Sequence, residues 1–419
     1  MQSEPTAEIA ELAPAPERRA TANRRTGANS KRRTGGRTTG SEVVKLNSTR
    51  AGKFIKSTAD ARAILDPATS PKVAVIGAGI SGLICASELK QAGVDVTVIE
   101  MGRGAGGRLA TRREQGLPFD HGTQYFTCSH QRFDELVQEW LLADAVKIWD
   151  GGNFGSINAG ESGGFVYVPA DRDSLRRSEK RYIGTPTSNA ICKLLEKNIG
   201  LEHFKYSTVV TQFKREQGQW QLLSNKEPYA LGTYDVVVAS AAVNGHPRFE
   251  KLYHSPPPLV DAMRPDLCAA VAQVEPEPCF SLMLAYDRAL GLPFDLASFG
   301  NSAILARVSR ENAKPGRETM WRLGDAFVPE STLSAMVAES SEEVLGSETP
   351  IERLVLLSTA GYGYSVVGRL NIHPEDRATV LAQVGDELLA AWNEVVWIIT
   401  IRSSAYILSW RCMFDTNRR

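Results

Sequence analysis

The 419-residue chain lacks the patterns that mark disulfide frameworks, metal sites and covalent nucleophiles. Its six histidines are dispersed, and no cluster of His and Cys has the spacing of metal ligands. Its cysteines are scattered too, with no C-x-x-C pair among Cys85, Cys128, Cys192, Cys268, Cys279 and Cys412. We therefore expect no metal, and we interpret the cysteines as mostly buried small hydrophobes of a reducing compartment.

The chain also lacks net charge, with 48 Lys and Arg against 48 Asp and Glu. The balance is uneven, because residues 1–70 hold 13 basic and 7 acidic residues and leave the remainder slightly acidic. This remainder has no basic bias, which argues against a nucleic-acid partner.

Residues 1–70 are rich in Ala, Thr, Gly and Arg, with eight cations and no carboxylate between Arg18 and Ser41. Such a composition cannot bury a core, so we predict a disordered basic tail or targeting segment. Three interpretations stay open: a solvated tail, an organelle (plastid) transit peptide, and a nuclear or nucleic-acid patch at residues 31–33. Early glutamates do not suit the second, and short basic runs carry little information for the third. The compartment is left open between the cytoplasm and an organelle.

Residues 395–414 are apolar enough to raise the question of a membrane segment. Arg402 stands near the middle of this stretch, where a charge costs about 2.5 to 3.5 kcal/mol on membrane-insertion scales. We therefore expect neither a spanning helix nor a membrane partner.

Residues 72–108 contain a complete phosphate-binding βαβ opening. Residues 73–76 form an unbroken apolar run, which is typical of a parallel strand buried on both faces. A G-x-G-x-x-G motif follows at once, formed by Gly77, Gly79 and Gly82. The first glycine makes the tight turn, the second lets the backbone approach a pyrophosphate, and the third lets helix and strand pack closely. The apolar spacing after the motif predicts a helix whose N-terminus faces the phosphates.

The second strand, expected at residues 94–99, leads into Glu100. A carboxylate at this distance from the glycines meets the hydroxyls of an adenosine ribose. A glycine-rich turn without a ligand would leave Glu100 unexplained. Gly106 and Gly107 then let the backbone turn back towards the phosphates, where Arg108 can add charge-assisted hydrogen bonds. The sequence therefore predicts a dinucleotide site.

An acidic residue followed by G-G-R resembles the FAD-binding flavin amine oxidase superfamily, so the resemblance implies FAD rather than NAD. The segment FDHGTQYFT at residues 119–127 resembles renalase and its plant and bacterial relatives, in which a similar segment passes close to the flavin ring. The resemblance implies that Gly122 lets the backbone approach the ring and that Thr123 and Gln124 hydrogen-bond it. His121 is an alternative catalytic candidate, although a histidine beside an aspartate in a turn is more often structural.

Residues 208–213 and 220–223 flank a turn at Gln217 and Gly218, which predicts a β-hairpin. In the superfamily, a valine at the start of this hairpin touches the adenine through its backbone, and Val210 is the best match. The predicted cofactor contacts are Gly77, Gly79, Ser81, Gly82, Glu100, Met101, Gly107, Arg108, Gly122, Thr123, Gln124 and Val210.

The predicted fold class is α/β, with a doubly wound, FAD-binding Rossmann-like domain and a second, mixed-sheet substrate domain. The first is expected at residues 71–250, with core segments 71–125 and 188–250, and the second at residues 251–394 together with 126–187. Thr187 or Ser188 is expected to cap the helix that follows it. The glycine-rich residues 151–164 are expected to form a surface loop.

The resemblance covers roughly residues 72–392 and then stops. Family members close with a strand, a Gly-Asp pair and a helix whose N-terminus points at the flavin. Of the two Gly-Asp pairs here, Gly324-Asp325 is out of family order and Gly385-Asp386 falls inside an expected amphipathic helix. We therefore expect a truncated or divergent C-terminus, with residues 395–419 as a tail outside the family pattern.

The resemblance implies an FAD-dependent oxidoreductase that accepts a hydride from a small substrate. A renalase-like enzyme would oxidise reduced nicotinamide species with oxygen as the acceptor. The alternatives are a flavin amine oxidase, and a truncated pseudoenzyme or non-enzymatic fold relative with weak FAD binding. Because a flavin carries such chemistry itself, no catalytic residue is predicted.

Overall fold

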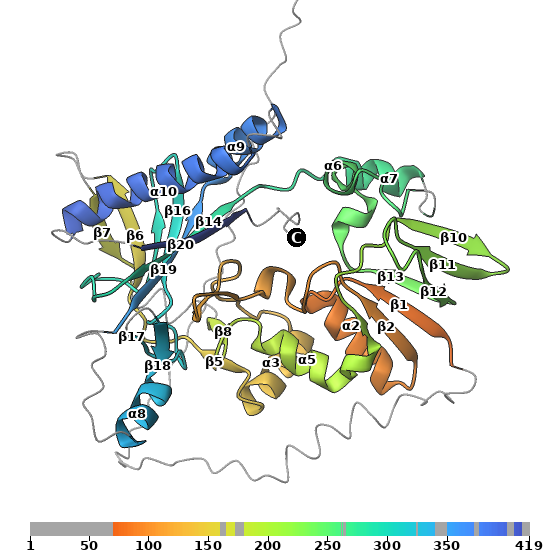
Figure 1. Cartoon of the computed structure of the whole chain (residues 1–419), viewed down its shortest axis with the longest axis horizontal. Coiled ribbons are helices and arrows are strands. Elements are labelled where there is room, and N and C mark those ends of the chain that lie inside the picture. The colour runs from red at the N-terminus through yellow and green to blue at the C-terminus, as the bar shows by residue number, and fades with distance from the viewer. Residues whose placement is uncertain are drawn as a thin grey trace, which may run out of the picture. The chain divides into compact units, whose positions relative to one another are not determined.

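The computed structural model of the chain describes residues 70–159, 165–171, 180–260, 262, 265–323, 326–339, 350–372, 377–399 and 406–412. All of them belong to one compact unit, Arg62–Arg419. The predicted basic tail lies outside the described residues except for Ser70, and so does the Gly324-Asp325 pair. Within the unit, two sheets organise the chain (Figure 1).

The first sheet has four parallel strands, as the buried apolar run at residues 73–76 predicted. Val75 of the central strand β1 pairs with Val238 on one side and with Val98 on the other. Both faces of β1 are covered, so Val73 to Ile76 are at most 5% exposed. The strand order is β13 (Val236–Ala239), β1 (Lys72–Ile76), β2 (Asp95–Ile99) and β9 (Phe204–Lys205).

Helices cover one face of this parallel sheet. α2 (Ile80–Gln91) connects β1 to β2 and packs beside α5 (Ala190–Ile199). α3 (Gln131–Leu142) contributes Val137 and Trp140 to the same hydrophobic core. A strand–helix–strand connection of this kind places the N-terminus of α2 at the carboxyl end of β1, where ligands bind in open α/β sheets.

An antiparallel sheet, rather than helices, covers the other face. Its strands β10 (Gln212–Glu216), β11 (Gln219–Leu223) and β12 (Ala230–Tyr234) pair in chain order. Their apolar side chains share a core with Ala74 and Ile76 of β1. The predicted hairpin is confirmed, since Gln217 and Gly218 join β10 to β11 with φ angles of +50° and +86°. Positive φ at both turn residues matches the twist of a two-residue hairpin.

The second sheet has seven strands and is mixed, which confirms the predicted fold class. β15 and β6 pair in parallel, and the other neighbouring strands pair antiparallel. The order is β20 (Tyr406–Cys412), β14 (Phe280–Tyr286), β19 (Glu352–Ser358), β16 (Leu305–Arg310), β15 (Leu296–Phe299), β6 (Phe154–Ala159) and β7 (Phe165–Pro169).

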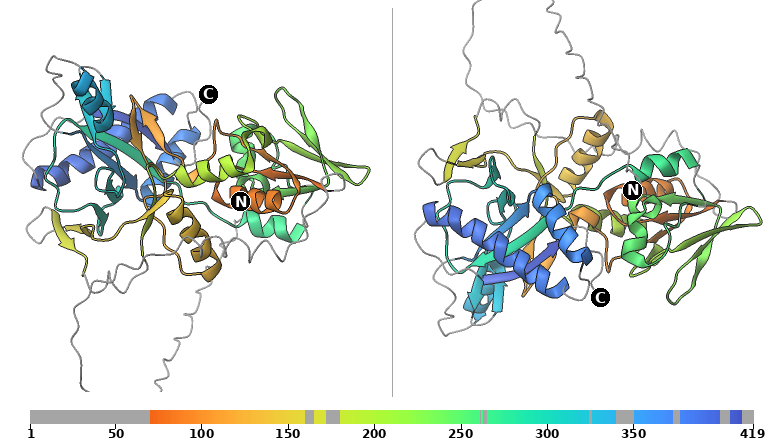
Figure 2. Two further views of the ribbon diagram at one scale, coloured as in Figure 1. Left: turned by 90° about the horizontal axis from the view of Figure 1, so that it is seen from below. Right: turned by 90° about the horizontal axis from the view of Figure 1, so that it is seen from above.

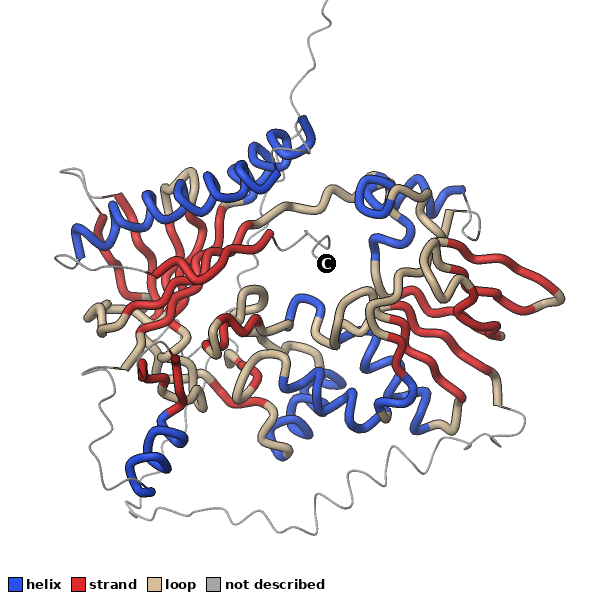
Figure 3. The backbone as a smooth tube through the Cα atoms, viewed as in Figure 1, coloured by secondary structure: helices blue, strands red, loops and turns tan. Residues whose placement is uncertain are grey.

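Two helices lie against one face of the second sheet, α9 (Ala360–Ile372) and α10 (Arg377–Ile399). Figure 2 shows α10 crossing the strands, and Figure 3 shows the helices gathered on this face. Leu282, Leu356 and Trp392 belong to the core between α10 and the sheet. The core therefore lies on the side of the sheet away from the glycine-rich motif.

A short hairpin packs on the opposite face of the second sheet. β3 (Arg112–Glu114) pairs with β4 (Leu117–Phe119) directly after the Gly106-Gly107-Arg108 segment. Leu117 and Phe119 share a core with Met283 and Val355 of the second sheet. This hairpin ties the glycine-rich region to the larger sheet.

Smaller elements complete the described part of the chain. They are the 3-10 turns at Gly107–Leu109, Leu201–His203 and Ala242–Gly245, the pair β5 (Val146–Ile148) and β8 (Tyr182–Gly184), the pair β17 (Met320–Leu323) and β18 (Ala326–Pro329), and the helices α6 (Arg248–Tyr253), α7 (Pro265–Ala272) and α8 (Glu330–Glu339).

Two local expectations differ from the observed structure. The expected surface loop at residues 151–164 is wrong, because Phe154–Ala159 form β6 between β15 and β7. Within residues 395–419, Val395 to Ile399 continue α10, and β20 pairs antiparallel with β14. Gly385 and Asp386 lie inside α10, as their helical context predicted.

Candidate functional site

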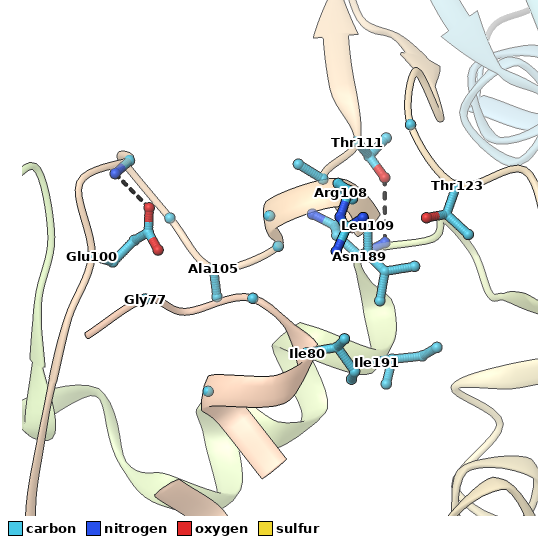
Figure 4. Close-up of a pocket in the computed structure, with 18 of the residues that line it drawn as sticks. Gly77, Ile80, Glu100, Ala105, Arg108, Leu109, Thr111, Thr123, Asn189 and Ile191 are labelled. Atoms are coloured by element: carbon cyan, nitrogen blue, oxygen red, sulfur yellow. Dashed lines mark hydrogen bonds between the residues drawn. The ribbon is translucent and has the colours of Figure 1, made fainter. Parts of the chain in front are cut away.

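A cavity of about 1030 Å³ lies at the carboxyl ends of the parallel strands (Figure 4). This is the upper end of the volume range of small-molecule and cofactor pockets. It is lined by ten of the twelve predicted contact residues: Gly77, Gly79, Ser81, Gly82, Glu100, Met101, Gly107, Arg108, Gly122 and Thr123. Gln124 and Val210 do not line it.

Each of the three motif positions is occupied by glycine for a different structural reason. Gly77 has a φ of +106°, and a Cβ there would lie 2.9 Å from Ser240 Oγ. A Cβ on Gly82 would lie only 2.0 Å from the carbonyl oxygen of Gly77. A Cβ on Gly79, in contrast, would meet no atom within 4 Å. Gly77 and Gly82 are therefore required by the turn itself, whereas Gly79 leaves open space on the cavity wall.

Glu100 is fixed at the edge of the cavity by two backbone amides. Ala78 N donates to Oε2 at 2.6 Å. Gly102 N donates to Oε1 at 2.6 Å, the bond drawn at Glu100 in Figure 4. Ala78 belongs to the glycine loop, so this carboxylate joins the loop after β1 to the end of β2. Each carboxylate oxygen can accept more than one hydrogen bond, so the two oxygens can still accept from hydroxyls of a ligand.

The Gly106-Gly107-Arg108 segment turns back to the glycine loop, as predicted. Gly106 N donates to Ala78 O at 3.0 Å, and Gly107 has a φ of +54°. A Cβ on Gly106 would lie 2.9 Å from Ala110 Cα, which explains this glycine sterically. Arg108 is exposed on the cavity wall, with its guanidinium available to an anionic ligand.

The segment from Gly122 to Gln124 divides between the cavity and the protein interior. A Cβ on Gly122 would lie 2.2 Å from Arg108 O, and Thr123 N donates to that same oxygen at 2.9 Å. Gln124 Nε2 donates to Asp120 O at 2.5 Å, and its Oε1 accepts from Lys314 Nζ at 3.0 Å. The Gln124 side chain therefore supports the wall from behind, while Gly122 and Thr123 face the cavity.

Two further predicted contacts, Met101 and Val210, lie in different surroundings. Met101 lines the cavity, and its sulfur lies 2.8 Å from the hydroxyl of Tyr253. Val210 is 3% exposed, and its side chain lies in the core between the parallel sheet and the β10–β12 sheet. The predicted contact of Val210 with an adenine concerns its backbone and stays a prediction.

Basic side chains surround the cavity beyond those predicted. Arg103, Arg112 and Lys193 line it together with Arg108, and among the described residues Glu100 is the one acid in the lining. Arg112 is paired with Glu114 at 2.9 Å, and Lys193 with Glu196 at 2.7 Å. The positive balance of the lining suits a ligand that carries phosphates.

A buried ionic cluster stands behind the wall formed by residues 120–124, and the sequence analysis did not find it. Lys314 Nζ contacts Glu311 Oε1 and lies 3.7 Å from Asp120 Oδ2. Arg317 NH2 contacts the same Asp120 oxygen. Thr111 Oγ1 and Ser188 Oγ each donate to Asp120 at 2.7 Å. Four side chains, those of Thr111, Ser188, Lys314 and Arg317, thus hold one carboxylate beside the cavity wall.

The charges of this cluster decide the protonation of Asp120. Burial by itself would raise the pKa of the Asp120 carboxyl, but the charges of Lys314 and Arg317 and the hydrogen bonds from Thr111 and Ser188 lower this pKa below its usual value. His121, the alternative catalytic candidate, is 5% exposed and lines the cavity next to this carboxylate.

Residues 75–140 match the family described as NAD(P)-binding Rossmann-like domain. Over 193 residues the chain is 28% identical to the mitochondrial protoporphyrinogen oxidase of Nicotiana tabacum, which covers 46% of this chain and 36% of that protein. Over 71 residues it is 56% identical to tryptophan 2-monooxygenase of Rhizobium rhizogenes, covering 16% and 10%. The alignments thus span about a third or less of these curated relatives.

Solved structures resemble the chain over most of its length. An oxidoreductase from Methanosarcina mazei aligns with a TM-score of 0.51 at 13% identity, covering 83% of this chain and 89% of that one. A structure from Exiguobacterium sp. aligns with a TM-score of 0.53 at 12% identity, covering 83% and 87%. At this identity the likeness establishes the fold: an α/β protein with a Rossmann-like domain and a second domain built on a mixed sheet.

No described helix is both long and apolar enough to cross a bilayer. No group of His, Cys, Asp and Glu side chains among the described residues could hold a metal ion.

Proposed function

We propose that the chain binds FAD in the cavity at the carboxyl ends of β1 and β2. The observation that carries the proposal is Gly79, which no neighbouring atom requires to be glycine and whose missing side chain leaves space on the cavity wall. A pyrophosphate next to the N-terminus of α2 would explain why this position is a glycine, because it could then approach the backbone closely. The tobacco and Rhizobium relatives are named as an oxidase and a monooxygenase, which supports redox chemistry at such a site.

Different residues of the cavity would contact different parts of the cofactor. Glu100, held by the amides of Ala78 and Gly102, would accept hydrogen bonds from the ribose hydroxyls. Arg108 would meet the pyrophosphate with its planar guanidinium. Gly122 and Thr123 line the part of the cavity towards the second sheet, where the flavin ring would lie. The cluster around Asp120 keeps this wall in place from behind.

The proposed reaction is oxidation of a small substrate. When bound, FAD supplies a two-electron acceptor that takes a hydride from the substrate, and the protein contributes binding and orientation. We propose a renalase-like enzyme that oxidises reduced nicotinamide species, with oxygen as the final acceptor. Oxygen then receives the two electrons and two protons, so hydrogen peroxide is the second product. Amine oxidation is the competing proposal within the same superfamily.

The cofactor content of the purified protein tests the proposal that the chain binds FAD. The purified protein should be yellow and should release FAD on denaturation, identified by chromatography of the supernatant. A colourless protein that takes up no FAD on titration would contradict the proposal.

Substrate class is tested on FAD-loaded protein under anaerobic conditions. Reduced nicotinamide isomers should bleach the visible flavin band, and admission of air should restore it with release of hydrogen peroxide. A series of primary amines should leave the band unchanged. Bleaching by amines alone would transfer the assignment to an amine oxidase.

A further inference from the structure

Two arginines lie against the ring of Tyr125, close to the proposed flavin wall. The guanidinium carbon of Arg181 is 5.5 Å from the ring centroid, and that of Arg307 is 5.8 Å away. Tyr125 follows Thr123, which lines the cavity, by two residues. Neither arginine nor Tyr125 lines the cavity itself, but both guanidinium groups meet at a ring two residues along the chain from its lining, and each is within range of a cation–π contact.

The second sheet and the strand pair β5–β8 provide these side chains. Arg181 directly precedes β8 and also lies 4.7 Å from the ring centroid of Phe154. Arg307 belongs to β16 and pairs with Ser298, which in turn pairs with Ser156 of β6. Paired residues share a face, and alternate residues along a strand do so too. Arg307 and Phe154 therefore project from the same face of the sheet, the one that also carries Val355 against β4.

The charge of Arg307 is not balanced within the described part of the chain. No carboxylate of a described residue forms an ion pair with its guanidinium, although the side chain is half-buried. Arg310, three residues along the same strand, is paired with Glu352 at 3.0 Å and Asp295 at 3.3 Å. Arginine forks match carboxylates and phosphates bidentately, so a guanidinium left without an acceptor suits an anion from outside.

The same strand carries a buried hydroxyl group that has no hydrogen-bond partner among the described residues. The hydroxyl belongs to Ser309, which is fully buried. It stands two residues from Arg307 on the same face, which places the two Cα atoms about 7 Å apart. Buried hydroxyl groups are normally satisfied, so this one adds an unused donor near the unpaired charge.

We infer that Arg307, Arg181 and Tyr125 form a subsite for an anionic group of the substrate, a carboxylate or a phosphate. This inference rests on the proposed function, because it places the subsite beside the flavin wall. It favours an anionic substrate, such as a reduced nicotinamide nucleotide, over a cationic amine, which the two arginines would repel. The aromatic ring that both guanidinium groups approach also suits a ligand with a flat apolar part.

Binding of simple probes tests the subsite without turnover. Isothermal titration of FAD-loaded protein with benzoate, phenyl phosphate and benzylamine compares two anions with a cation of similar shape. Wild type should bind at least one anion and not benzylamine. Loss of a charged hydrogen bond costs about 1.5 kcal/mol or more, so Arg307→Gln should weaken anion binding about tenfold or more. Preference for benzoate or for phenyl phosphate distinguishes a carboxylate from a phosphate substrate.

Arg215→Gln is the matched control, because Arg215 also stacks on a ring, 5.3 Å from the centroid of Trp220, on the exposed β10–β11 hairpin. It should bind the anions like wild type. Equal anion affinity in Arg307→Gln and Arg215→Gln, or no anion binding by wild type, would overturn the inference. Arg181→Gln provides a second variant if Arg307→Gln does not fold.

Flavin content is recorded separately for each variant. It should be the same in all of them, since none of the substituted residues lines the cofactor cavity. If the protein takes up no FAD but still binds the anions through Arg307, the cofactor assignment fails and the subsite stands. If FAD binds and the anions do not, the subsite alone fails.

Discussion

The ammonium group of Lys314 lies 3.7 Å from the carboxylate of Asp120, and neither side chain reaches solvent, with exposures of 0% and 1%. Two further charged groups, Glu311 and Arg317, contact this pair directly. Burying charges costs several kcal/mol per ion, which is offset only when each is paired and hydrogen-bonded. The cluster therefore makes the cavity wall at residues 120–124 dependent on the loop after β16.

Removing the Lys314 charge should destabilise the fold strongly. Lys314→Met leaves Asp120 and Glu311 buried with less compensation, and breaking a buried pair costs about 3 to 5 kcal/mol. Lys147→Met is the control, because Lys147 lies at the same 3.7 Å from Asp144 but on the surface, with side-chain exposures of 40% and 77%. An exposed pair contributes about 1 kcal/mol or less. Urea unfolding of both variants measures the difference, and similar losses would show that the buried cluster contributes little.

The depressed pKa of Asp120 predicts a pH dependence. A carboxylate whose pKa is lower in the folded than in the unfolded chain stabilises the fold above the unfolded pKa, about 3.9. That stabilisation is lost as the pH falls through the lower, folded pKa. The difference in unfolding free energy between wild type and Asp120→Asn should be largest near neutral pH and should shrink below about pH 4. A constant difference in acid would contradict a lowered pKa.

Gly79 and Gly82 should separate cofactor binding from folding. Gly79→Ala places a Cβ in open space, so its melting temperature should stay close to that of wild type while FAD affinity falls. Gly82→Ala forces a Cβ to 2.0 Å from Gly77 O and should lower both. Differential scanning calorimetry and FAD titration of apoprotein measure the two effects. Unchanged FAD affinity in Gly79→Ala would place the pyrophosphate elsewhere.

Glu100 should contribute to affinity through the ribose. Removing a charged acceptor costs about 1.5 to 3 kcal/mol, so Glu100→Ala should weaken FAD binding about ten- to a hundredfold. Glu100→Gln keeps one acceptor oxygen but turns its NH2 group towards one of the two donating amides, so it should weaken FAD binding as well. Glu202→Ala, on an exposed side chain, is the control. If the affinity of Glu100→Ala equals that of the control, the carboxylate only anchors the loop amides of Ala78 and Gly102.

The local parts of the site were predictable from the sequence, and the distant ones were not. Lys72 to Arg108 could be interpreted because strand, turn, helix and carboxylate follow one another within 37 residues, and their spacing carries the geometry. The Gln217-Gly218 hairpin is local in the same way. Gln124 and Lys314, in contrast, are 190 positions apart, and no spacing rule connects them.

Two errors show what tertiary contacts change. Thr187 or Ser188 was expected to cap α5, but Asn189 is the residue that precedes the helix. The hydroxyl of Thr187 donates to Asn189 Oδ1, and that of Ser188 donates to Asp120. The cluster around Asp120 thus takes the group that the helix end would otherwise use. Phe154–Ala159 have the glycine-rich flanks of a loop, but parallel pairing with β15, more than a hundred residues away, makes them a strand. Lys314 and Arg317 could not be recognised from their own neighbourhood in the sequence, because their partner Asp120 lies almost 200 positions away.

The last prediction concerns β20, which pairs with β14 at the edge of the second sheet. An unpaired edge next to the fully buried β14 would offer hydrogen-bonding groups to other chains and promote aggregation. Successive amides of an antiparallel strand point alternately towards the partner and away from it. Ser409 and Trp410 pair with Met283 and Leu282, so Ser409→Pro and Trp410→Pro place one proline at an inward amide and one at an outward amide. The inward variant should lose soluble yield and melt at a lower temperature, while the outward one should resemble its matched control, Ser409→Val or Trp410→Val, since edge strands tolerate proline there. Equal behaviour of both proline variants and their valine controls would mean that β20 is dispensable for covering β14.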